Sequence, residues 1–155
     1  MPHQITGPAE SSRGAGTRRA RAFFLAWLTV AAWAGVIFAF SATPHLRVAE
    51  AADLDFVLRK AGHMAAFGVL AVLLWRALTL SAVRQAFVWS FALTVAYAAT
   101  DEFHQSFTAG RNASGVDVSI DALGALIALL ALVLWCVRAR PAGRPPEYDL
   151  LVGDR

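Results

Sequence analysis

The stretch VSIDALGALIALLALVLWCV, from Val118 to Val137, holds twenty residues with one charged side chain, Asp121. As an α-helix rising about 1.5 Å per residue, it would extend about 30 Å, which is the thickness of the hydrocarbon core of a bilayer. Only helices and closed barrels satisfy their backbone hydrogen bonds in lipid, and this run is too long and too uniformly apolar for a barrel strand. The stretch therefore predicts a transmembrane helix.

Three apolar blocks of similar length precede this stretch, and the whole chain shares their character. Of its 155 residues, 57% are hydrophobic and 16% are charged, whereas soluble domains carry about 25% charged residues. A soluble bundle of four such helices would have little polar surface. We therefore predict an all-α membrane protein with four transmembrane helices in an antiparallel bundle. The three earlier blocks are Ala22 to Ser41, Ala61 to Leu80 and Arg84 to His104.

The distribution of Lys and Arg predicts the orientation of these helices. Ten of the 14 basic residues precede the first block, flank the connection between the second and third blocks, or follow the fourth. Since basic residues near the ends of membrane helices favour the cytoplasmic side, both termini are predicted to be cytoplasmic in a bacterial inner membrane. We expect a membrane domain at 22–137 between two disordered tails, a basic one at 1–21 and a second at 138–155.

Polar residues gather where the blocks meet on the predicted outer side. Lys60 and His63 stand at the start of the second block, and Asp101 and Glu102 at the end of the third. Each pair is placed against the preference of the helix dipole, so pairing between them would relieve both. We predict one outward-facing polar pocket walled by the second, third and fourth helices. Its expected ligand-binding residues are Lys60, His63, Asp101, Glu102, His104, Gln105, Arg111, Asp117 and Asp121.

The fourth block carries two further local signals. Ser114 followed three residues later by Asp117 matches a capping box at a helix N-terminus, which would give Asp117 a structural role. Gly124 and Ala128 form a pair of small residues that allows two membrane helices to approach closely. The face that holds this pair and Asp121 is therefore predicted to point into the bundle.

The combined motifs are similar to those of the VanZ-like family of small bacterial membrane proteins. The similarity covers roughly Trp27 to Val137, and it implies a role in the cell envelope that affects susceptibility to glycopeptides such as teicoplanin. Asp121 departs from the pattern, in which we expect Asn. The motifs that carry the resemblance are Trp33-x-x-Val-Ile-Phe with Ser41 and Pro44, Lys60-x-x-His63-x-x-x-Phe67, Asp101-Glu102-x-His104-Gln105-x-Phe107, Gly110-Arg111, and Ser114 with Asp117.

Three functions remain open for this pocket. It could bind an anionic lipid or a lipid-linked cell-wall precursor, with Arg111, Lys60 and His104 holding a phosphate group. It could hydrolyse or transfer a lipid phosphate, with His104 as nucleophile or general acid/base beside Asp101 or Glu102. It could also be an ion-pair network that fixes the helices in register, with function exerted through a partner protein.

The sequence carries no HExxH spacing or other local ligand signature. We therefore expect neither a metal nor a cofactor. We expect the lipid bilayer as the environment and no nucleic-acid partner. Homo-oligomerisation stays open.

Overall fold

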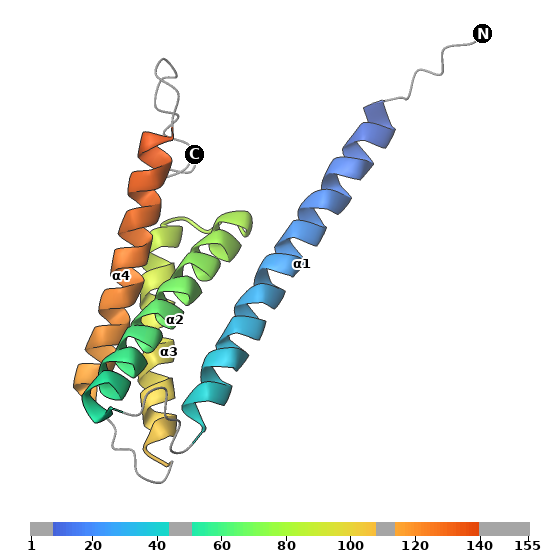
Figure 1. Ribbon diagram of the computed structural model, residues 1–155. Helices are drawn as coiled ribbons and strands as arrows, with labels where there is room; N and C mark the ends of the chain where they lie inside the picture. Colours follow the sequence, from blue (N-terminus) through green and yellow to red (C-terminus); the bar gives the residue numbers. More distant parts are fainter. Residues whose placement is uncertain (1–7, 44–50, 108–113, 140–155) are drawn as a thin grey trace.

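The computed structural model describes residues 8–43, 51–107 and 114–139, and these residues form helices without any strand. The helices are α1 (Pro8–Ser41), α2 (Ala52–Leu80), α3 (Ala86–Gln105) and α4 (Gly115–Arg138). In Figure 1, α2, α3 and α4 pack side by side, while α1 approaches them at its C-terminal half and diverges toward its N-terminus. The predicted all-α class is confirmed.

Four helix ends meet at one end of the molecule. Figure 1 places the C-terminal ends of α1 and α3 there, together with the N-terminal ends of α2 and α4. At the opposite end a short turn joins α2 to α3. Ala82 and Gln85 in this turn adopt left-handed backbone conformations, with φ of 55° and 57°. The polar residues of the sequence motifs therefore collect at a single end of the helices.

Three segments in the described ranges are long and apolar enough to cross a membrane: Gly16–Ser41, Asp53–Leu80 and Gly115–Arg138. They make the chain a multi-pass membrane protein by length and composition. The fourth predicted span, α3, is not among them. Polar residues account for this difference, because α3 buries Ser90 and Thr94 in its middle and ends in an acidic and histidine-bearing turn.

Two helices begin earlier than the apolar blocks indicated. The second block was expected to start at Ala61, but α2 starts at Ala52 and absorbs part of the predicted outer loop. Lys60 and His63 consequently lie about two and about three turns inside α2, so the predicted conflict with the helix dipole does not exist for them. Helix α1 likewise starts at Pro8, so residues 8–21 are helical where a disordered tail was expected.

Small residues bring α2 and α4 into close contact. A Cβ atom added to Gly124 would collide with the backbone carbonyl of Met64, and one added to Gly68 would lie 3.2 Å from both the Ala128 Cβ and the Gly124 carbonyl oxygen. The predicted close approach through Gly124 and Ala128 is therefore confirmed, with Gly68 as its counterpart on α2. This crossing holds the polar ends of α2 and α4 next to each other.

Hydrogen bonds along its length attach α1 to its neighbours. The Trp27 indole N–H donates to the Ser81 hydroxyl at 3.2 Å, and the Trp33 indole N–H donates to the Ala66 carbonyl at 2.9 Å. The Tyr97 hydroxyl of α3 donates to the Ala34 carbonyl at 2.7 Å. Among the described residues α1 packs on α2 and α3, and no Cα atom of α1 lies within 8 Å of a Cα atom of α4.

Candidate functional site

A cavity of about 560 Å³ lies at the end of the molecule where the polar residues collect. Ligand sites for small molecules commonly enclose about 300–1,000 Å³, so the volume suits a bound molecule. All four helices contribute to its wall, whereas we expected only the second, third and fourth. The lining residues are Trp33, Val36, Ile37, Phe40 and Ser41 of α1, Phe56, Leu58, Arg59, Lys60, Gly62, His63 and Ala66 of α2, Glu102 and Gln105 of α3, and Asp117, Ile120 and Asp121 of α4.

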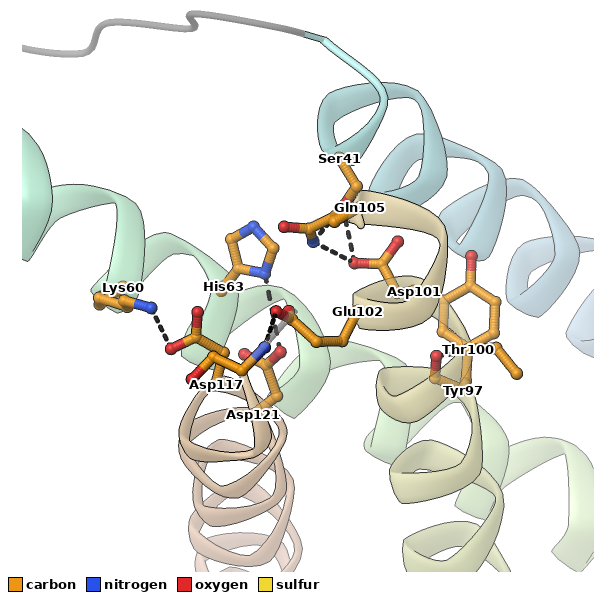
Figure 2. Close-up of polar contacts among 11 residues, drawn as sticks. Ser41, Lys60, His63, Tyr97, Thr100, Asp101, Glu102, Gln105, Asp117 and Asp121 are labelled. Atoms are coloured by element: carbon orange, nitrogen blue, oxygen red, sulfur yellow. Dashed lines mark hydrogen bonds and ion pairs between the residues drawn. The ribbon is translucent and has the colours of Figure 1, made fainter. Parts of the chain in front are cut away.

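Two contacts between a basic and an acidic side chain connect α2 to α4 along the cavity (Figure 2). The Lys60 ammonium donates to Asp117, and both side chains are 28% exposed. One turn further along both helices, the His63 Nδ1 lies 3.7 Å from the Asp121 carboxylate, which is buried. The structure therefore pairs Lys60 and His63 of α2 with carboxylates of α4, whereas the sequence suggested carboxylates of the third helix.

Glu102 of α3 caps the first turn of α4. Its carboxylate accepts a hydrogen bond of 2.6 Å from the backbone N–H of Ser114, the N-cap residue of α4. The Ser114 side chain makes no capping hydrogen bond, and Asp117 is turned toward Lys60. The predicted capping box is thus wrong: a carboxylate from another helix satisfies the helix N-terminus, where free N–H groups favour an anion.

A second polar cluster joins α1 to α3. The Ser41 hydroxyl and the Gln105 amide donate to the same oxygen of Asp101, at 2.7 and 2.8 Å. All three side chains are buried, and the other Asp101 oxygen has no hydrogen-bond partner among the described residues. Ser41 was not among the predicted site residues, although its position at the end of a long apolar block is a sequence signal for it.

His104 lies apart from the lining of the cavity. Its ring centroid is 4.4 Å from that of Phe38 on α1, and its Nδ1 has no hydrogen-bond partner among the described residues. Asp101 also is not part of the lining. Arg111, the remaining predicted residue, lies outside the described residues. Of the nine predicted residues, the structure places Lys60, His63, Glu102, Gln105, Asp117 and Asp121 around the cavity.

Sequence reasoning missed the apolar side of the cavity. Trp33, Val36, Ile37 and Phe40 line it from α1. Their spacing of three and four residues is that of a single helix face, which was the available signal. Because this face is as apolar as the lipid-facing sides of α1, periodicity alone does not separate them. The cavity therefore combines an apolar wall on one side with charged groups on the other.

The charged groups of the lining can bind a further polar group. The Lys60 ammonium has three N–H donors, and the contact with Asp117 uses one of them. Arg59 forms an ion pair of 2.9 Å with the buried Asp55. In the described part of the chain, no group of three or more His, Cys, Asp and Glu side chains is arranged to hold a metal ion. The arrangement is suited to hydrogen bonding with a ligand.

Fold and cavity together define a multi-pass helical membrane protein with an amphipathic cavity between its helices. The chain belongs to the VanZ/LLP1 family, whose model matches residues 22–136. The match leaves out the N-terminal part of α1 and spans every residue of the cavity lining. No curated protein and no solved structure matches the chain.

Proposed function

We propose that this protein sits in the bacterial cytoplasmic membrane with four antiparallel spans and both termini in the cytoplasm. The uneven distribution of Lys and Arg supports this orientation. The fourth span would be α3, which has 20 residues and packs against both α2 and α4. The cavity would then lie at the outer side of the membrane, in the same interfacial region as lipid headgroups.

In this location, we propose, the cavity binds the headgroup of an anionic lipid or a lipid-linked cell-wall precursor. The observation that carries this proposal is the joining of Lys60, Arg59 and His63 with an apolar wall in one cavity. Phosphate groups are bound by Lys and Arg through charge-assisted hydrogen bonds. Arg111 would contribute a second guanidinium. Binding of this kind would link the protein to the cell envelope and to glycopeptide susceptibility, as its family resemblance implies.

The carboxylates around the cavity do not oppose an anionic ligand as strongly as their number suggests. Asp117 is paired with Lys60, Asp121 faces His63, and Glu102 accepts from the Ser114 N–H. Each of these contacts offsets part of the negative charge. In the proposed complex the carboxylates hold Lys60 and His63 in place while their remaining N–H groups face the ligand.

Native mass spectrometry of the protein purified in mild detergent tests this function. We expect a co-purifying anionic lipid or polyprenyl phosphate on the wild type, and loss of at least half of it in Lys60→Met and in Arg111→Ala. Arg84→Ala is the matched control, since exposed Arg84 lies in the turn between α2 and α3, at the opposite end of the molecule. Equal lipid in all four proteins would contradict headgroup binding.

The contacts between helices favour one second candidate, a structural ion-pair network. Lys60 with Asp117 connects α2 to α4, and Ser41 with Asp101 connects α1 to α3. Under this candidate the polar groups would fix the packing of the helices, and a partner protein would carry the function. Two results together would support the structural network. Exchanging the charges of Lys60 and Asp117 would restore folded protein, and neither single change would alter the amount of bound lipid.

A further inference from the structure

We infer that the ligand of the cavity is an intact membrane lipid whose hydrocarbon chain lies along α1, and that it enters sideways from the bilayer between α1 and α4. This inference rests on the proposed function and deepens it. A headgroup site alone would also accept a water-soluble phosphate. A site that also holds a hydrocarbon chain requires the apolar part of the same lipid molecule.

The apolar wall is built to contact a chain. Trp33, Ile37 and Phe40 follow one another along α1 over about two turns, and Phe56 and Ile120 belong to the same lining. The hydrogen bond from the Trp33 indole to the Ala66 carbonyl leaves that ring no free polar group. The aromatic and aliphatic side chains of this wall offer dispersion contacts, as a hydrocarbon requires, and the Ser41 hydroxyl at its end already donates to Asp101.

The polar groups stand on the other side of the same cavity. Lys60, His63, Asp117 and Asp121 come from facing positions of α2 and α4. A molecule that fills the cavity thus meets charged groups on one side and the α1 wall on the other. The cavity is partly open to its surroundings, and its volume of about 560 Å³ lies within the range of sites that hold small molecules. An amphiphile matches both its size and its two-sided lining.

The side between α1 and α4 is where such a molecule can enter. Both helices line the cavity, yet among the described residues no Cα atom of α1 lies within 8 Å of a Cα atom of α4. Phe40 of α1 and Phe56 of α2 line the cavity while remaining 59% and 57% exposed. These positions face the surroundings of the protein, which for membrane-spanning helices are lipid chains.

Gly62 provides a direct test of the occupied space. It lines the cavity, and a Cβ atom added there meets no other atom within 4 Å. Gly62→Leu therefore fills cavity volume without a backbone collision, and Leu is also favoured over Gly within a helix. Gly35 of α1 is the matched control, because its added Cβ meets nothing within 4 Å either and Gly35 does not line the cavity.

The experiment measures binding of dioleoyl phosphatidylglycerol to full-length protein in detergent, with glycerol 3-phosphate and dioleoyl phosphatidylcholine as competitors. We expect Gly62→Leu to weaken binding at least about tenfold, or about 1.4 kcal/mol. Gly35→Leu should bind as the wild type does. Glycerol 3-phosphate should not displace the lipid. Thermal unfolding of each variant reports whether it is folded. The lipid affinity of Gly62→Ala, which adds a smaller side chain, should lie between that of the wild type and that of Gly62→Leu.

The outcomes separate this inference from the proposed function. If glycerol 3-phosphate displaces the lipid and Gly62→Leu binds lipid as well as the wild type does, the site for the hydrocarbon chain is overturned. Headgroup binding would still stand. Equal binding of both lipids, each lost in Gly62→Leu, would support the chain site and contradict a preference for anions. Absence of lipid binding by the wild type would overturn both.

Discussion

Glu102 accepts a hydrogen bond of 2.6 Å from the backbone N–H of Ser114, so the end of α3 caps the start of α4. This contact connects the last turn of α3 to the N-cap residue of α4. It also explains a buried carboxylate at the C-terminus of α3, where the helix dipole disfavours an anion. The partner is the N-terminus of the next helix, which favours one.

The interhelical cap predicts an unusual pair of mutational effects. Glu102→Ala should lower the free energy of unfolding by about 1–2 kcal/mol, because it removes a capping acceptor from a buried position. Ser114→Ala should change stability by less than about 0.5 kcal/mol, since the Ser114 hydroxyl makes no capping bond. Thermal or denaturant unfolding in detergent measures both. The reverse ranking would show that Ser114 caps its own helix.

The pairing of Lys60 with Asp117 predicts rescue by charge exchange. Lys60→Asp should reduce folded protein in the membrane, because it places two carboxylates together between α2 and α4. Combining it with Asp117→Lys should restore folding, with a coupling energy of about 0.6–1.7 kcal/mol as found for polar contacts in membrane bundles. A double-mutant cycle of unfolding free energies measures this coupling. Additive effects of the two changes would contradict the pairing.

The crossing of α2 and α4 predicts strong sensitivity at Gly124. Gly124→Ala should destabilise the protein by about 1–3 kcal/mol, because the added methyl group collides with the Met64 backbone. Gly115→Ala is the control on the same helix, since its added Cβ meets nothing within 4 Å. Thermal unfolding of both variants in the same detergent provides the comparison. A Gly124→Ala protein as stable as wild type would require a wider crossing than the structure has.

The buried cluster around Asp101 predicts a cost for losing one hydroxyl. Ser41→Ala should reduce the unfolding free energy by about 1–3 kcal/mol, because a buried carboxylate oxygen loses one of its two donors. Thr43→Ala is the matched control: its hydroxyl is exposed and donates to the Ala39 carbonyl within the same segment. Unfolding measurements on the two variants should differ clearly. Equal, small effects would mean that Gln105 alone satisfies Asp101.

Most of the candidate site could be predicted as a set of residues, but its pairing could not. The sequence placed Lys60 and Asp117 at the same end of the molecule, and the structure confirms that placement. It suggested carboxylates of the third helix as partners for Lys60 and His63, and a capping box at Ser114. Both differ from the structure, because helical periodicity defines the face of a residue but not the rotation of that face toward a neighbouring helix.

The sequence by itself determined that the chain is helical and apolar enough for a membrane, because lipid leaves the backbone few other ways to satisfy its hydrogen bonds. It also determined that polar chemistry collects at one end. Only the tertiary structure decided that Glu102 caps α4 and that α1 supplies the apolar wall of the cavity. Those outcomes depend on how closely Gly68 and Gly124 let two helices approach and on how α1 is attached, and these are properties of packed side chains from distant parts of the chain.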